Sequence, residues 1–239
     1  MITIIKILFL LGFLIILHEF AHYAVARLCK VKVNEFSVGF GKKILQRKVD
    51  DTVYSLRLIP LGGYVNLKGL DERNSDPDSY TSVSIWKRML IILAGSIANI
   101  LFGIVTYFVL ITILYGINTG LMATGNFFFS IFESLKMLFT GEVGLDQFTG
   151  PIGISSIISE TKAVTEFIYL LALVSLSLGV TNLLPIPPLD GFKFFLLLIE
   201  KIRRKPFGEK FEVNMQFLGF VLLLGLSIYV AYNDVLRIF

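Results

Sequence analysis

Long apolar runs dominate the chain and predict helices that cross a membrane. A spanning helix needs about 20 largely apolar residues, and four runs approach or exceed that length, at residues 2–26, 89–117, 167–199 and 217–231. The third run is interrupted by Pro185, Pro187 and Pro188. Because proline removes a helical hydrogen bond and clashes with the preceding turn, we expect this span to be broken.

Between the first two runs, at residues 33–68, the pattern changes to short alternating stretches separated by turn residues such as Gly41. Such alternation predicts a small antiparallel sheet or hairpin at the membrane surface. Residues 127–139 are apolar but include Glu133 and Lys136, which favours an amphipathic helix lying on the membrane. We therefore expect one all-α polytopic membrane domain with about four transmembrane helices, a small β-sheet and a proline-broken third span.

The composition agrees with a membrane protein. Hydrophobic residues make up 55% of the chain and the mean hydropathy is +0.76, which excludes the soluble globular class. The single cysteine, Cys29, excludes an intrachain disulfide framework and a cysteine-rich zinc site. No cleavable signal peptide is expected, because the first apolar run carries the candidate chemistry described below.

Positive charge is distributed unevenly and predicts the orientation. Of the 22 Lys and Arg residues, 12 lie between Arg27 and Arg88 and 5 between Lys201 and Lys210. Basic loops stay in the cytoplasm, so both termini are expected outside it. The net charge of +4 follows from this topology and gives no reason to expect nucleic acid as a partner, whereas membrane lipid is one.

The two histidines of the chain, His18 and His22, flank Glu19 in the first apolar run. Positions i and i+4 share one helix face, so both imidazoles can reach one metal ion. Glu19 is placed to act on a water bound to that metal instead of ligating it. Ionisable residues at the end of an apolar run are costly in lipid, and the default interpretation is functional.

A catalytic zinc needs three protein ligands and an open position. Because there is no third histidine, a carboxylate must complete the set, and Asp190 is the one carboxylate between Glu166 and Glu200. It follows the proline break, where irregular backbone survives only if it is buried in protein or lines a cavity. The sequence thus predicts one Zn²⁺ per chain, held by His18, His22 and Asp190.

Peptide hydrolysis is the reaction this set favours, with Glu19 as general base and then general acid. Asn182, before the proline break, is a candidate to hydrogen-bond an extended substrate. Asn99 and Gly95 of the second run serve either helix packing or the shaping of a substrate site. The sheet is either a solvated hairpin or an edge that binds substrate by β-addition, and Gly63 within it is a further substrate-binding candidate.

Two other classes compete with a protease. A transporter that uses His18, Glu19 and His22 as a proton relay explains buried ionisable residues. It does not explain their spacing, and the paired repeats typical of transporters are not evident in the sequence. A catalytically silent, substrate-holding relative is the third possibility, and the presence of all four catalytic residues argues against it.

Several segments together resemble the site-2 proteases, the intramembrane zinc metalloproteases of the M50 type, and specifically the bacterial regulator-of-sigma-E protease type. The matching segments are His18 to His22, Pro60 to Val65, Ala94 to Asn99, Thr149 to Ile154 and Asn182 to Gly191. The resemblance implies cleavage of single-pass membrane proteins or remnant signal peptides in a bacterial inner membrane. It also implies zinc ligation by His18, His22 and Asp190, catalysis by Glu19 and substrate positioning by Asn182.

One departure from that family concerns domain organisation. Relatives carry one or two PDZ domains between the second and third spans, whereas here only residues 118–126 join the flanking segments. We therefore expect a family member without a PDZ domain. Small residues in the second span serve either internal packing or a homo-oligomer.

Overall fold

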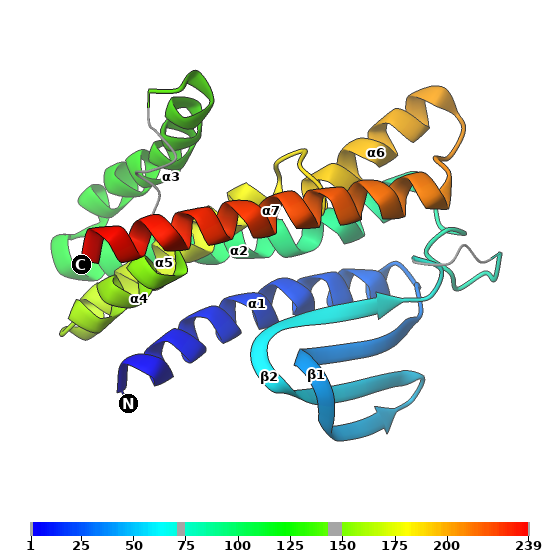
Figure 1. Cartoon of the computed structure of the whole chain (residues 1–239), viewed down its shortest axis with the longest axis horizontal. Helices are drawn as coiled ribbons and strands as arrows, with labels where there is room; N and C mark the ends of the chain where they lie inside the picture. Colours follow the sequence, from blue (N-terminus) through cyan, green and yellow to red (C-terminus); the bar gives the residue numbers. More distant parts are fainter. Residues whose placement is uncertain (1, 71–74, 143–149, 239) are drawn as a thin grey trace.

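The computed structural model describes residues 2–70, 75–142 and 150–238 as a helical membrane protein with one small sheet (Figure 1). The elements in chain order are α1 (Ile2–Leu28), β1 (Val33–Val49), β2 (Thr52–Leu67), α2 (Ile85–Tyr115), α3 (Ile117–Thr140), α4 (Pro151–Glu160), α5 (Val164–Asn182), α6 (Asp190–Arg203) and α7 (Glu209–Ile238).

Within the described residues, four helices are long and apolar enough to cross a membrane. They are Thr3–Leu28, Ile85–Tyr115, Val164–Asn182 and Glu209–Arg237. The predicted polytopic helical fold with about four spans is therefore confirmed. The fourth apolar run underestimates its helix, since α7 begins at Glu209, eight residues before the predicted start. Polar residues can continue a helix that an apolar run begins, so the length of the run is only a lower bound on the helix.

The third predicted span is broken where the prolines predict. Helix α5 ends at Asn182 and α6 begins at Asp190, so the connection between them is residues 183–189. The connection folds tightly onto the start of α6. A Cβ on Gly191 would lie 2.2 Å from the carbonyl oxygen of Leu183. Only glycine permits this approach, which fixes the backbone directly after Asp190.

The sheet between α1 and α2 is confirmed, with strands longer than the predicted runs. The first half of β1 is central, because Phe36 pairs with Val65 on one side and with Tyr54 on the other. Gly39 and Gly41 have φ values of +86° and +83°, a region that glycine reaches at little cost. These residues bend β1 without ending it, so the predicted turn at Gly41 became a bend within one strand.

Aromatic contacts attach the sheet to α1, and Figure 1 shows the two side by side. The ring of Tyr23 on α1 lies 5.5 Å from the ring of Phe36, and its hydroxyl lies 2.6 Å from that of Tyr54. This attachment brings the edge segment of β2, residues 63–67, alongside the helix that carries both histidines.

A charged cluster stiffens the other face of the sheet. Nη2 of Arg57 donates to Glu35 Oε1 at 3.0 Å and to the hydroxyl of Tyr64 at 2.6 Å. Burial raises the pKa of Glu35, but hydrogen bonds from Ser55, Lys43 and Arg57 outweigh it and bring that pKa down to about 2. Glu35 is therefore ionised over the physiological range, and through Arg57 it orients Tyr64.

Helix α3 follows α2 at once, after Gly116 with φ +88°. It includes both the predicted link at 118–126 and the predicted amphipathic segment at 127–139. Phe127 stacks on Tyr107 of α2 with 4.1 Å between ring centroids, and it is buried with Leu176 of α5. No domain-sized segment therefore separates α2 from α3. The position of α3 relative to the membrane surface stays a prediction.

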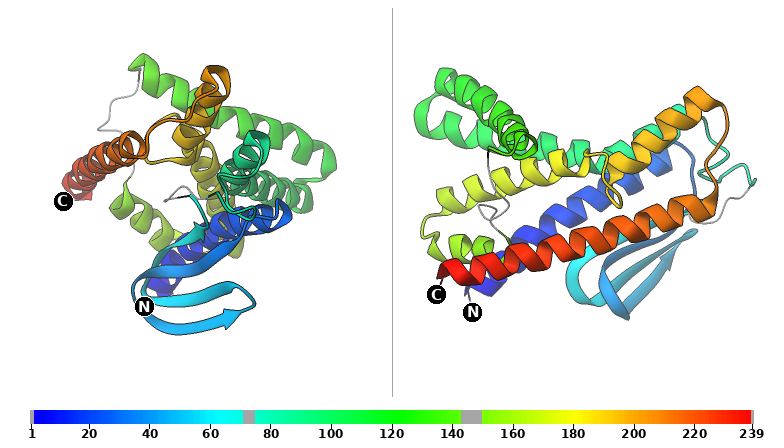
Figure 2. Two further views of the ribbon diagram at one scale, coloured as in Figure 1. Left: turned by 90° about the vertical axis from the view of Figure 1, so that its right-hand side faces the viewer. Right: turned by 45° about the horizontal axis from the view of Figure 1, so that its top comes forward.

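The chain ends at the side of the bundle where it begins. Figure 2 shows the N- and C-termini at the same end, while the connections after α1, before α2 and between α6 and α7 lie at the opposite end. An even number of spanning helices produces this arrangement, and it gathers the basic connections at one end.

Candidate metal centre

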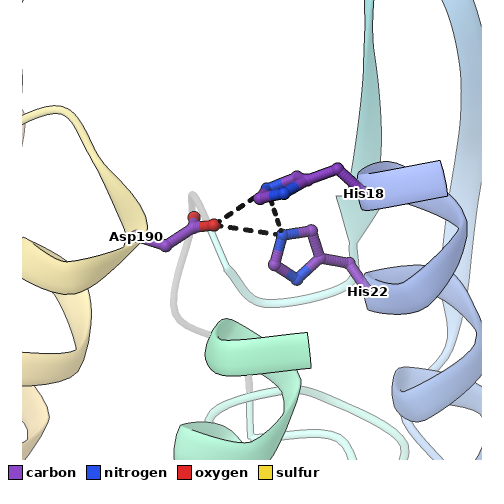
Figure 3. Close-up of side chains that lie close together, drawn as sticks. All are labelled: His18, His22 and Asp190. Carbon is purple, nitrogen blue, oxygen red and sulfur yellow. Dashed lines mark hydrogen bonds and ion pairs between the residues drawn. The ribbon is translucent and has the colours of Figure 1, made fainter. Parts of the chain in front are cut away.

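Three side chains from two distant parts of the chain converge on one point (Figure 3). The Nε2 atoms of His18 and His22 lie 3.0 Å apart. Oδ2 of Asp190 lies 3.0 Å from Nε2 of His18 and 3.2 Å from Nε2 of His22. Helix α1 supplies both imidazoles on one face, and the first residue of α6 supplies the carboxylate.

The spacing of these atoms fits a tetrahedral zinc ion. Zinc binds nitrogen and carboxylate oxygen at about 2.0–2.2 Å, so neighbouring ligand atoms in a tetrahedron lie about 3.3 Å apart. The three sides of the triangle are 3.0, 3.0 and 3.2 Å. Two imidazoles and one carboxylate also leave the fourth position open, as a catalytic site requires.

Both histidines have partners on α2 for the ring nitrogen that points away from this triangle. Nδ1 of His22 lies 2.7 Å from the carbonyl oxygen of Ile91. A carbonyl accepts, so Nδ1 carries the proton and Nε2 is free to bind a metal.

The side-chain amide of Asn99 is next to the other ring, with its Nδ2 lying 3.5 Å from Nδ1 of His18. A protonated Nδ1 requires the amide oxygen of Asn99 as its acceptor. That oxygen is buried without a hydrogen-bond partner among the described residues, and a 180° turn of the amide, which exchanges two nearly indistinguishable atoms, directs it toward this nitrogen. The amide of the fully buried Asn99 is therefore within reach of His18 and in a position to orient its ring.

Gly95 lies between these two partners and faces the ligands directly. A Cβ at this position would lie 2.5 Å from Nε2 of His22 and 2.6 Å from Nε2 of His18. Small residues in a membrane helix usually indicate helix packing. Here Gly95 packs directly on the side chains of His18 and His22.

Glu19 lies in the same pocket as the three candidate ligands and beside the sheet edge. The pocket is lined by His18, Glu19, His22, Tyr64, Val65, Leu67, Leu70, Ile91, Ile92, Asp190 and Lys193. Gly63 packs against Glu19, since a Cβ on it would lie 3.3 Å from Glu19 Cγ. The edge of β2 is therefore one wall of the site.

Four candidate residues line this pocket: His18, Glu19, His22 and Asp190. Asn99 and Gly63 do not line it but each contacts a residue that does, Asn99 reaching His18 and Gly63 packing on Glu19. Asn182 is half-buried at the end of α5 and is not among the lining residues. Sequence reasoning missed Ile91 and Lys193. The spacing of Lys193, three residues after Asp190 on α6, is a signal that would have placed it on the ligand's face of the helix.

Comparisons with known proteins match nearly the whole chain. The model of a family described as "Peptidase family M50" matches residues 6–226. Proteins of Clostridium acetobutylicum and Helicobacter pylori, both named "Putative zinc metalloprotease", are 27% and 25% identical to the chain. The first alignment covers 94% of both chains, and the second covers 96% of this chain and 98% of the relative. The zinc metalloprotease RasP of Shouchella clausii is 42% identical over 112 residues, which is 46% of this chain and 27% of the relative.

The longer alignments also show a difference in length. The alignment with the Clostridium protein runs over 323 positions, more than the 239 residues of this chain. That relative therefore contains internal sequence that has no counterpart here. The direct junction between α2 and α3 is consistent with the expected lack of a PDZ domain at this point.

Proposed function

Because the chain belongs to peptidase family M50, we propose that it hydrolyses peptide bonds of single-pass membrane proteins at a zinc ion held by His18, His22 and Asp190. The observation that carries this proposal is the triangle of ligand atoms with Glu19 in the same pocket. The four residues derive from two segments that lie 172 residues apart in the sequence, and the fold brings these segments together.

Zinc is the cofactor that the chemistry and the relatives both indicate. The ligand set offers nitrogen and oxygen atoms at tetrahedral spacing, and relatives are named as zinc metalloproteases. Zinc bound here would polarise the peptide carbonyl and lower the pKa of a bound water to about 7. One ion per chain is expected.

The protein's own residues supply positioning and proton transfer. Ile91 and Asn99 hold the two imidazoles in the tautomer that leaves Nε2 free. Glu19, next to His18 and packed on Gly63, is placed to accept a proton from the attacking water and to return it to the leaving amine. Because Glu19 accepts one proton and then releases one, it ends each cycle in the ionisation state in which it began.

The substrate segment is proposed to be extended when it is cut. The edge of β2, residues 63–67, borders the pocket and can pair with such a segment through backbone hydrogen bonds. Gly63 leaves that edge open beside Glu19. Asn182 is retained as a substrate-binding candidate from the family resemblance alone, at the end of the helix that precedes the proline-rich connection.

The proposed setting is the inner membrane of a bacterium, with single-pass proteins or remnant signal peptides as substrates and lipid around the spans. The basic connections at one end of the bundle are proposed to face the cytoplasm. Both termini, which lie at the other end (Figure 2), then face outward. Of the two uses expected for the small residues of the second span, we favour internal packing over self-association, because Gly95, Ser96 and Asn99 are buried within the chain.

The test is cleavage of a single-pass substrate by the purified protein in detergent, with zinc measured in the same samples. The wild type should bind about one zinc per chain and cleave. Glu19→Gln should keep its zinc and lose activity by about 10²–10⁴-fold, the usual contribution of general acid–base catalysis. Undiminished cleavage by Glu19→Gln contradicts the mechanism. A wild type without zinc favours the proton-relay alternative, and zinc without turnover favours the substrate-holding one.

A further inference from the structure

Helix α7 crosses the bundle almost without burying side chains. Among its described residues, Gly219, Val230 and Asp234 are the buried ones. The rest of the helix is exposed or half-buried, although it passes the connection that carries Asp190. Since so few positions hold α7, each of them has a large influence on where the helix lies.

The first of these positions brings α7 against the proline-rich connection. A Cβ on Gly219 would lie 2.0 Å from the carbonyl oxygen of Pro187 and 2.6 Å from its Cβ. Pro187 is three residues before Asp190, and Gly191 packs the other end of the same connection onto Leu183. The connection is therefore confined between its own helix and α7.

The second position attaches the C-terminal end of α7, called its outer end below, to α4. Asp234 is 2% exposed. It accepts hydrogen bonds from the backbone N–H of Gly150 at 3.1 Å and of Gly153 at 2.9 Å. These N–H groups belong to the first turn of α4, where a carboxylate is favoured.

The beginning of α7 is also tied. The backbone N–H of Phe207, in the turn before α7, donates to Oε1 of Glu200 on α6 at 2.8 Å. Gly219 thus lies between two attachments, at Phe207 and Asp234. The distance along the helix from Gly219 to Asp234 is about 22 Å at 1.5 Å per residue. A side chain added at Gly219 would therefore collide with Pro187, because α7 is held on both sides of Gly219 and cannot move away freely.

We propose that Gly219 is a positioning residue for the metal centre, through which α7 fixes the connection that presents Asp190 to His18 and His22. In this arrangement α7 contributes no ligand. Its backbone, brought close by glycine, limits how far Pro187 moves and so where the carboxylate of Asp190 lies. The inference rests on the proposed zinc site, and it does not require that the protein cleave any particular substrate.

The test compares two leucine substitutions on one helix. Gly219→Leu is expected to weaken zinc binding by about 10–100-fold, the range seen when a ligand loses its supporting partner. Gly225→Leu is the matched control, since a Cβ there meets nothing within 4 Å, and it should bind zinc as the wild type does. The dissociation constant is measured by competition with a chromophoric chelator, without any substrate.

Two further variants separate positioning from damage to the fold. Gly219→Ala adds one methyl group and should show a smaller loss of zinc affinity in a protein that still folds. Gly219→Leu combined with Asp234→Ala frees the outer end of α7, so zinc affinity should partly return. Wild-type affinity in Gly219→Leu overturns the proposal, and so does a double variant no better than the single one. A wild type that binds zinc but cleaves nothing would count against the proposed function alone.

Discussion

Substituting Gly95 by alanine is the most direct test of how α2 shapes the metal centre. The added methyl carbon would lie 2.5 Å from Nε2 of His22 and 2.6 Å from Nε2 of His18, whereas ordinary van der Waals contact begins at 3.4 Å. One helix must therefore give way by about 0.8–0.9 Å, and metal sites tolerate deviations of only about 0.2 Å in ligand distance.

The expected result is a loss of zinc affinity larger than the about 10–100-fold that follows removal of a supporting partner. The protein itself should still fold, because alanine is a better helix former than glycine by about 1 kcal/mol. Zinc per chain is measured after equilibration with chelators of graded affinity, and helix content is followed by circular dichroism in the same samples.

Gly125→Ala on α3 is the control, since a Cβ at that position has no neighbour within 4 Å. It makes the same chemical change in another helix and should keep wild-type zinc affinity. If Gly95→Ala binds zinc as tightly as Gly125→Ala does, the close packing of α2 on the two imidazoles is not what defines the site, and the reasoning from the glycine fails.

Three further predictions concern other parts of the site and the sheet. Asp190→Asn removes the charged ligand and should lower the zinc content below one ion per chain, measured by metal analysis. A variant that retains one zinc per chain would show that Asp190 is not the third ligand. Asn99→Leu keeps the branched shape of the side chain but removes the acceptor for His18, so zinc affinity should fall by about 10–100-fold, again by chelator competition. An unchanged affinity would contradict the orienting role of Asn99. The pKa of Glu35 is about 2 in the fold against an ordinary 4.5, so its contribution to stability is complete above pH 4.5 and is lost as the pH falls toward 2. Glu35→Gln should therefore flatten the decline in unfolding temperature between pH 4.5 and 2, and an equally steep decline would contradict this.

The parts of the site that follow from local geometry could be predicted from the sequence. His18 and His22 share a helix face by spacing alone. Asp190 could be found because apolar surroundings leave few alternative carboxylates and because prolines mark where the span breaks. The first inference depends on a single helix and the second on the scarcity of carboxylates in an apolar run, so neither requires knowledge of how the helices pack.

The contacts of the supporting residues could not be predicted in this way. Gly95 and Asn99 indicate only that α2 has a small, partly polar face, and the sequence does not say which helix that face meets. Asp234 is one acidic residue near the outer end of a span, a position where a solvated carboxylate is equally ordinary. Its hydrogen bonds to the first turn of α4 depend on the arrangement of helices that are about 80 residues apart in sequence.

Ile91, Gly95 and Asn99 are spaced four residues apart on α2, opposite His22 and His18 on α1. The carbonyl of Ile91 serves one histidine, Asn99 serves the other, and Gly95 makes room between them. The two antiparallel helices therefore pair turn by turn, with each of these turns of α2 opposite one turn of α1. A single residue inserted between Ile91 and Asn99 would rotate the remainder of that face by about 100°, so a change of length in this stretch of α2 should displace both contacts at once, whereas a substitution displaces one.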